Sequence, residues 1–184
     1  EVIAPLLHAA PSATVASNSS SMPVARFGDV DQLDRLVNLH FYVRPWERRV
    51  VELMTSGETE AGRVDDLRLL MASLGFEVFV LSKPSFGLLY NRIWAAIKRE
   101  ALAIVDEGVA DAATIDAICR ALDPNPPRGP FERMDTVGLD TVRLIEQAYA
   151  DELGWPRSRT LGDLVDAGHL GRKAGQGFFT YEQD

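Results

Sequence analysis

The stretch that decides the fold is Leu39-His40-Phe41-Tyr42, followed after a proline-containing loop by Arg49-Val50-Val51-Glu52-Leu53-Met54. Both segments are rich in the apolar, β-branched and aromatic residues that favour strands. If the two strands lie side by side, the Glu52 carboxylate can reach one imidazole nitrogen of His40. A carboxylate in that position fixes the tautomer and makes the other nitrogen a better general base. The alternative is that His40 simply lies at a strand end and Glu52 on the rim of the sheet, with no catalytic role for either residue.

The segments around this pair alternate between strand and helix patterns. A helical pattern covers residues 59–74, and strand patterns cover residues 13–17, 36–41, 49–54 and 76–81. Short connections between such elements are typical of an α/β sheet. Residues 1–83 are therefore predicted to form an α/β domain.

After Lys83 the pattern changes to long helices. Four segments there have helical periodicity: residues 85–107, 111–122, 131–153 and 161–167. Asp111 is placed as an N-cap of the second, and Gly138 is a predicted break in the third. The expected fold class is α/β followed by all-α, with a second domain over residues 84–184.

Composition and charge exclude several classes of protein. The formal net charge is −8, whereas broad nucleic-acid binding requires a basic face. No apolar run approaches the roughly 18 residues that indicate a membrane span, and no Cys/His cluster predicts a metal site. The single Cys119 cannot form an internal disulfide, which favours a cytoplasmic protein with this side chain buried in a helix.

Three further polar segments are candidates for a binding site. Asn18-Ser19-Ser20-Ser21 follows a predicted strand, where ligands bind in open α/β sheets, although the segment could simply cap a turn. Asn91 lies early in the long helix, where its amide either projects back toward the sheet or faces solvent. Lys173, in the glycine-rich turn Gly171–Gly177, either meets a phosphate or ribose or belongs to a surface turn.

In order and spacing, five segments together resemble the 3-hydroxyacyl-CoA dehydrogenase family. They are Ala16-Ser17-Asn18-Ser19-Ser20-Ser21, Leu39-His40-Phe41 with Val51-Glu52, Gly87-Leu88-Leu89-Tyr90-Asn91-Arg92, Gly129-Pro130-Phe131-Glu132 with Asp135-Thr136-Val137-Gly138-Leu139-Asp140, and Gly171-Arg172-Lys173-Ala174-Gly175-Gln176-Gly177-Phe178. The resemblance implies the C-terminal half of a Rossmann-type NAD-binding sheet, with antiparallel last strands as one option. It also implies a helical domain that forms a homodimer.

The resemblance further implies a reaction and a role for each site residue. His40 would remove the proton of the substrate's 3-hydroxyl while hydride passes from C3 to NAD⁺, and Glu52 would orient His40. The product would be a 3-oxoacyl-CoA, as in fatty-acid oxidation. The remaining matches are the substrate-binding positions Ser20 and Asn91 and the cofactor-binding positions Asn18 and Lys173.

Two departures from the family pattern leave other functions open. Val43 and Arg44 stand where family members carry Asn-Pro, and Val43 cannot make the asparagine's contacts to nicotinamide. No G-x-G-x-x-G follows a first strand, so the first βαβ units would precede Glu1, and the chain is expected to be a fragment. The alternatives are a dehydrogenase of a free hydroxy acid or carnitine-like compound, and a non-catalytic dehydrogenase-like binding protein.

Overall fold

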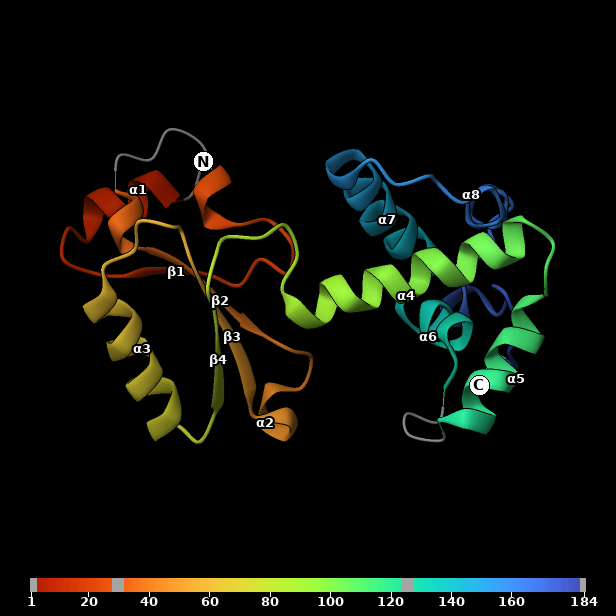
Figure 1. Ribbon diagram of the computed structural model, residues 1–184, viewed down its shortest axis with the longest axis horizontal. Helices are drawn as coiled ribbons and strands as arrows, with labels where there is room; N and C mark the ends of the chain where they lie inside the picture. The colour runs from red at the N-terminus through yellow and green to blue at the C-terminus, as the bar shows by residue number, and fades with distance from the viewer. Residues whose placement is uncertain (1–2, 28–31, 124–127, 183–184) are drawn as a thin grey trace. The chain divides into compact units, whose positions relative to one another are not determined.

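A computed structural model describes residues 3–27, 32–123 and 128–182 of the chain (Figure 1). The chain divides by its internal contacts into two compact units, Glu1–Arg92 and Ile93–Asp184. The first unit contains a four-stranded sheet, and the second is built from helices. The prediction of an α/β part followed by an all-α part is confirmed.

The sheet is mixed, and its antiparallel pair joins the two strands that carry His40 and Glu52. Its strands lie in the order β1 (Val15–Ser17), β2 (Leu36–Phe41), β3 (Val50–Thr55) and β4 (Glu77–Leu81). β1 is parallel to β2 and β3 is parallel to β4, whereas β2 and β3 are antiparallel. In the β2–β3 register His40 is directly opposite Glu52, so the two strands do lie side by side.

The two faces of the sheet carry different kinds of side chain, because successive residues of a strand point to opposite sides. One face is apolar and packs against α3 (Ala61–Ser73) through Val37, Leu39, Val51, Leu53 and Met71 (Figure 1). The other face holds three buried polar side chains, those of Asn38, His40 and Glu52. The His40–Glu52 pair therefore points away from the α3 layer.

The segments around the sheet are short. They are α1 (Ile3–Ala9), η1 (Val24–Arg26), η2 (Leu33–Arg35) and α2 (Pro45–Arg48). The buried guanidinium of Arg35 donates to the carbonyl oxygens of Leu7, Ala10 and Ala13, which fixes the end of α1 and the turn after it. The connection between β2 and β3 contains α2, a single helical turn that begins at a proline.

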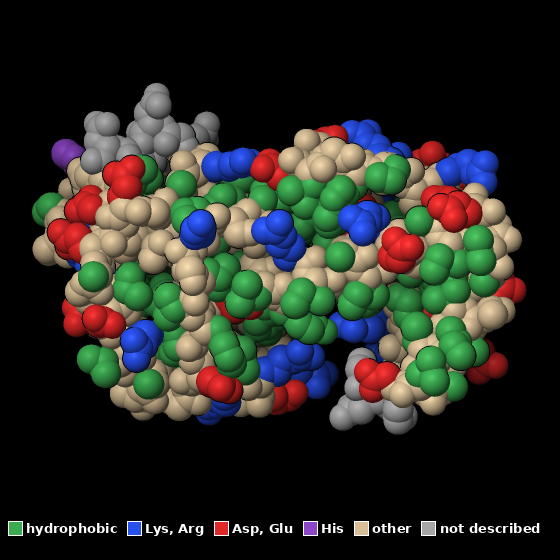
Figure 2. Space-filling model, viewed as in Figure 1, with side chains coloured by type: hydrophobic (Ala, Val, Ile, Leu, Met, Phe, Trp, Pro, Cys, Tyr) green, Lys and Arg blue, Asp and Glu red, His purple; other side chains and the backbone are tan. Residues whose placement is uncertain are grey.

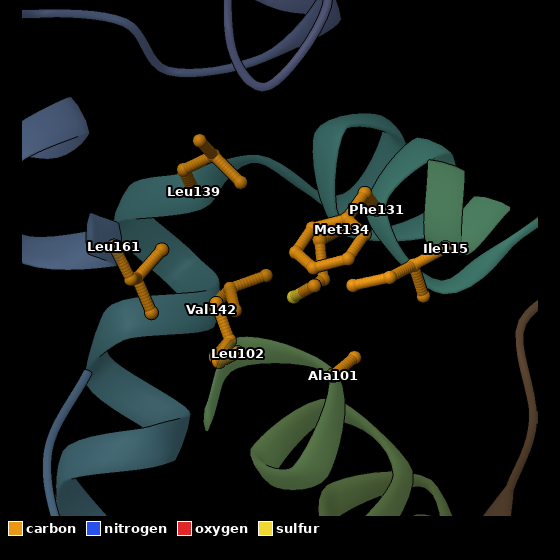
Figure 3. Packing of buried hydrophobic residues seen from close by; sticks show 8 residues of the cluster. All are labelled: Ala101, Leu102, Ile115, Phe131, Met134, Leu139, Val142 and Leu161. Carbon is orange, nitrogen blue, oxygen red and sulfur yellow. The ribbon is translucent and has the colours of Figure 1, made fainter. Parts of the chain in front are cut away.

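The second unit packs its helices around one apolar core. The helices are α4 (Leu89–Asp106), α5 (Ala112–Leu122), α6 (Pro130–Val137), α7 (Leu139–Leu153), α8 (Arg159–Asp166) and the single turn η3 (Arg172–Ala174). Figure 3 shows this core: Val142 lies beside Leu102 of α4, and Met134 and Phe131 lie between Val142 and Ile115. Two local predictions are confirmed: Asp111 caps α5 by accepting from Thr114 N at 2.7 Å, and Gly138, with φ 99°, separates α6 from α7.

Asp116 fastens α5 to the start of α6. Its carboxylate is fully buried and accepts the backbone N–H groups of Phe131 and Glu132 at 2.9 and 2.8 Å. These donors belong to the first turn of α6, where backbone N–H groups lack helical partners. A Cβ atom at Gly129 would collide with Asp116, so this close approach requires a glycine.

Asp135 fastens the C-terminal segment to α6 in the same way. Its buried carboxylate accepts the N–H groups of Phe178 and Phe179 at 3.0 Å each and the hydroxyl of Tyr181 at 2.8 Å. A Cβ atom at Gly177 would overlap this carboxylate. The glycine-rich end of the chain is therefore held in place from inside the helical unit.

Two local predictions were wrong. The long helix begins at Leu89 rather than at residue 85, because Gly87 takes φ 76° and donates its N–H to the Ser21 carbonyl at 2.7 Å. Cys119 is exposed rather than buried, because α5 buries Ile115 and Asp116 and leaves its last turns at the surface. None of the helices in the described ranges combines the length and hydrophobicity needed to cross a membrane.

Candidate functional site

His40 and Glu52 form the centre of the candidate site on the polar face of the sheet. They are directly opposed in the β2–β3 ladder, and their side chains are only 6% and 4% exposed. Opposed residues of an antiparallel pair have Cβ atoms roughly 4.5–5.5 Å apart. An imidazole and a carboxylate are thus neighbours in a place largely shielded from water.

The Glu52 carboxylate is bonded to the start of α4 rather than to His40. Oε2 accepts the N–H of Leu89 at 3.1 Å, and Oε1 accepts the N–H of Tyr90 at 3.3 Å. A carboxylate is favoured there, because the first N–H groups of a helix lack helical partners and carry partial positive charge. The expected bond between carboxylate and imidazole is not formed, and within the described ranges the buried Nδ1 of His40 has no hydrogen-bond partner.

The surroundings of His40 favour its neutral form. Burial lowers its pKa from the ordinary value of 6.5, because desolvation penalises the charged imidazolium. The ring of Tyr42 meets the imidazole edge to face, with centroids 4.8 Å apart. Burial and then the charge of Glu52 raise the pKa of the Tyr42 hydroxyl, so this group stays un-ionised. The site therefore offers an imidazole that can accept a proton at neutral pH.

Ser20 and Asn91 meet in the structure although they are 71 residues apart in the sequence. Asn91, in the first turn of α4, donates from Nδ2 to the backbone carbonyl of Ser20 at 3.1 Å. The same helical turn supplies the two N–H groups that Glu52 accepts. Both predicted substrate-binding residues thus belong to segments that are bonded to one another and to the His40–Glu52 centre.

Asn18 connects the ends of the two parallel strands β1 and β2. It follows Ser17, the last residue of β1, and its Oδ1 accepts the N–H of Phe41 at 2.9 Å. Ligands bind beyond the carboxyl ends of parallel strands in open α/β sheets. The structure therefore places this predicted cofactor-binding residue at an edge where a ligand can bind.

Asn38 is a site-forming residue that the sequence analysis missed. It is fully buried in β2, donates from Nδ2 to Met22 O at 3.0 Å and accepts the N–H of Val24 at 2.9 Å. These bonds hold the segment that follows Ser20. The available signal was a single amide inside the apolar run Leu36–Leu39, on the same face as His40 two residues later.

Lys173 lies in the helical unit, in the turn η3. Its exposed Nζ donates to both carboxylate oxygens of Asp140 at 2.6 Å. This ion pair gives the lysine a partner within its own unit. Its assignment to the cofactor stays a prediction.

The loop after His40 carries the departure from the family pattern. Val43 is 82% exposed, and Arg44 adopts a left-handed conformation (φ 60°) with an ion pair to Glu47 at 3.3 Å. Among the residues that the structure describes, no group of three or more His, Cys, Asp or Glu side chains could hold a metal ion.

Two family models match consecutive parts of the chain. The NAD binding domain of 3-hydroxyacyl-CoA dehydrogenase matches residues 1–83, and the C-terminal domain of the same enzyme matches residues 87–181.

Individual proteins with similar sequences and structures carry related names. A 3-hydroxyacyl-CoA dehydrogenase-like protein of Cochliobolus heterostrophus is 42% identical over 149 residues, which cover 79% of this chain and 31% of that protein. A 3-hydroxybutyryl-CoA dehydrogenase of Bradyrhizobium diazoefficiens is 34% identical over 93% of this chain and 59% of its own length. The crystal structure of (S)-3-hydroxybutyryl-CoA dehydrogenase from Ralstonia eutropha superposes with a TM-score of 0.82 at 30% identity, covering 91% of this chain and 60% of that one. The chain thus spans about a third to three fifths of the length of these relatives.

Proposed function

The chain belongs to the 3-hydroxyacyl-CoA dehydrogenase family, and we propose that it carries the catalytic base of an enzyme that oxidises a 3-hydroxyacyl-CoA to a 3-oxoacyl-CoA. The observation that carries this proposal is the placement of His40 directly opposite Glu52, buried, with its pKa lowered. An imidazole of this kind is neutral at the pH of the cell and can take up the proton of a hydroxyl group.

Each residue of the site has a role in this proposal. His40 accepts the proton of the substrate's 3-hydroxyl, and Glu52, fixed by the N–H groups of Leu89 and Tyr90, stabilises the imidazolium that forms. Ser20 and Asn91 hold the substrate oxygen near the imidazole. The Asn91–Ser20 bond supports this pairing, because it ties the two segments together without using the Ser20 hydroxyl.

The residues at the carboxyl edge of β1 and β2 fit a nicotinamide cofactor. Asn18 stands at that edge and is held by Phe41 N, next to the strand position of His40. NAD⁺, when bound, supplies the acceptor for the hydride that leaves C3 of the substrate. We assign Asn18 to contact with the cofactor and keep Lys173, which lies in η3, as a second cofactor-binding residue.

A homodimer formed through the helical unit is part of the proposal. Apolar side chains of this unit are exposed on α4 and α7, including Ile93, Ile97, Leu144 and Ile145, and Figure 2 shows hydrophobic side chains at the surface of this unit. Exposed apolar side chains of this kind commonly mark an interface between protein chains. Sedimentation velocity should give a dimer that Ile97→Asp converts to a monomer, while Glu100→Gln on the same helix leaves it intact.

We further propose the cytoplasm as the location of the protein. The support is the single, exposed Cys119, since a free surface thiol persists in a reducing compartment. Microscopy of the tagged protein in its native cells tests this assignment, and a signal from another compartment would overturn it.

The catalytic proposal is tested with the natural full-length protein and a panel of substrates. NADH formation from NAD⁺ is expected with 3-hydroxyacyl-CoA esters and not with the free hydroxy acids or with carnitine. His40→Ala should lower kcat by about 10²–10⁴-fold, the usual value of a general base. His8→Ala serves as the control, because this histidine is exposed on α1. Normal turnover by His40→Ala would remove His40 from the mechanism, and NADH binding without turnover of any substrate would favour the binding-protein alternative.

A further inference from the structure

We propose that Tyr42 is a positioning residue, whose hydroxyl donates to the Glu52 carboxylate and limits how strongly that carboxylate acts on the imidazole of His40. The inference deepens the proposed function, because it assumes that His40 is the base. It concerns a residue to which the family resemblance gave no role. Three observations on the polar face of the sheet carry it.

Tyr42 is packed against the imidazole from the same side of the chain. It follows His40 by two residues, and alternate residues of an extended segment share a face. Its ring lies edge to face with His40 at 4.8 Å and with Tyr90 at 5.8 Å between centroids. The ring is thereby fixed between β2 and the first turn of α4, which also binds Glu52 through Tyr90 N.

The Glu52 carboxylate has acceptor capacity left after its two backbone bonds. An ionised carboxylate has about four acceptor positions, and the N–H groups of Leu89 and Tyr90 occupy one on each oxygen. Nδ1 of His40 and the hydroxyl oxygen of Tyr42 are both buried and, among the described residues, lack a hydrogen bond of regular geometry. The register places Glu52 opposite His40, and the charge of the same carboxylate acts on the Tyr42 hydroxyl.

The electrostatics of the phenol agree with this assignment. Burial raises the pKa of Tyr42, and the charge of the Glu52 carboxylate raises it further. Tyr42 therefore remains an O–H donor throughout the range in which His40 titrates. Among the described residues, the titratable groups that act on Tyr42 are Glu52 from β3 and Tyr90 from α4.

A phenol on the carboxylate has a definite consequence for His40. A hydrogen bond to Glu52 spreads part of its negative charge onto the phenol, so less remains to stabilise an imidazolium. Replacing the hydroxyl by hydrogen should leave the ring packing in place and free the carboxylate for Nδ1. The pKa of His40 should then rise, and the base would be protonated over a wider pH range.

The test is an NMR titration of the histidine side chains in the natural full-length protein and in Tyr42→Phe. The His40 signal is identified by its absence from the spectrum of His40→Ala. We expect the His40 titration to move to higher pH in Tyr42→Phe, and the acid limb of the kcat profile to move with it while KM stays unchanged. Tyr149→Phe, which removes a buried hydroxyl in the helical unit, should leave the His40 titration where it is.

A double-mutant comparison separates positioning from a general structural effect. In a Glu52→Gln background, Tyr42→Phe should no longer move the His40 titration, because the shared acceptor has lost its charge. An unchanged His40 titration in the single variant, or an equal shift in both backgrounds, would overturn the inference. If the wild-type protein fails to turn over any substrate but the titration shifts as expected, the proposed function fails while the positioning role of Tyr42 stands.

Discussion

The buried carboxylates of the two units are used in the same way but have different neighbours. Glu52 in the sheet unit and Asp116 and Asp135 in the helical unit each accept two consecutive backbone N–H groups. Each therefore joins a distant segment to the element that carries it. Only Glu52 also lies opposite an imidazole, whereas the partners of the two aspartates are backbone and one tyrosine.

The three carboxylates make the same kind of interaction, but a structural role can be distinguished from a chemical one by their neighbours. A buried carboxylate that holds two N–H groups is sufficient to fix a helix start or a chain end, as Asp116 and Asp135 do. Glu52 performs the same fastening for α4 and in addition places its charge beside His40. Substitutions at the aspartates should therefore change stability alone, whereas substitutions at Glu52 should change stability and the chemistry of His40.

The largest effect is expected at Asp135. Asp135→Ala leaves the N–H groups of Phe178 and Phe179 and the hydroxyl of Tyr181 without their buried acceptor. The free energy of unfolding should fall by about 3–5 kcal/mol, as measured by urea denaturation. Tyr181→Phe removes one donor only and should cost about 1 kcal/mol. Equal losses in the two variants would contradict the view that the carboxylate organises the segment.

A smaller loss is expected from a methyl group placed against the same carboxylate. Gly177→Ala puts a Cβ atom where Asp135 Oδ1 lies, and should lower the free energy of unfolding by about 1–3 kcal/mol. Gly162→Ala is the matched control, because a Cβ there meets nothing within 4 Å and residue 162 lies in α8. It should be neutral or stabilising, since alanine favours a helix more than glycine does. Equal destabilisation by both variants would show that the loss does not come from overlap of the added methyl group with Asp135.

Two conservative amide variants, one in each unit, test this comparison most directly. Glu52→Gln and Asp116→Asn each turn an acceptor oxygen into an amide donor that faces a backbone N–H. Each should lower the free energy of unfolding by about 1–2 kcal/mol in thermal or urea denaturation. Only Glu52→Gln should also lower the pKa of His40 and reduce kcat. A kcat loss of the same size in Asp116→Asn would remove the distinction between the two units.

The smallest effect is a difference in the pH dependence of stability. Burial lowers the pKa of His40, so below its ordinary value of 6.5 the unfolded chain binds a proton that the folded chain does not, and stability falls as pH falls. Burial raises the pKa of Asp116 above its ordinary value of 3.8, so between that value and the folded pKa the folded chain binds a proton that the unfolded chain has lost. Stability therefore falls as pH rises through the folded pKa. Urea unfolding over a pH series should show that His40→Gln removes the first slope and Asp116→Asn the second. The same slope in wild type and His40→Gln would show that His40 is not shielded from water.

The sequence was sufficient to predict the main elements and the central pair. The β-favouring segments around His40 and Glu52 appeared as adjacent strands, and the Asp111 cap and the break at Gly138 followed from local chemistry. The start of α4 and the exposure of Cys119 were not predicted correctly. The first depends on a bond from Gly87 to Ser21, and the second on which turns of α5 other elements cover. Neither property is local in the chain.

The sequence by itself determined that the segments carrying His40 and Glu52 are strands, because β-favouring residues and strand periodicity are local properties of the chain. That the two residues lie directly opposite each other depends on the pairing of the strands. Only the tertiary structure decided what the Glu52 carboxylate binds. Its donors come from a helix start 37 and 38 residues later, and they, rather than His40, hold its hydrogen bonds. Tyr42 against the imidazole and Asn38 beneath the Ser20 segment depend on the same packing. A backbone N–H is present in nearly every residue, so no residue type in the sequence marks which N–H will approach a given carboxylate.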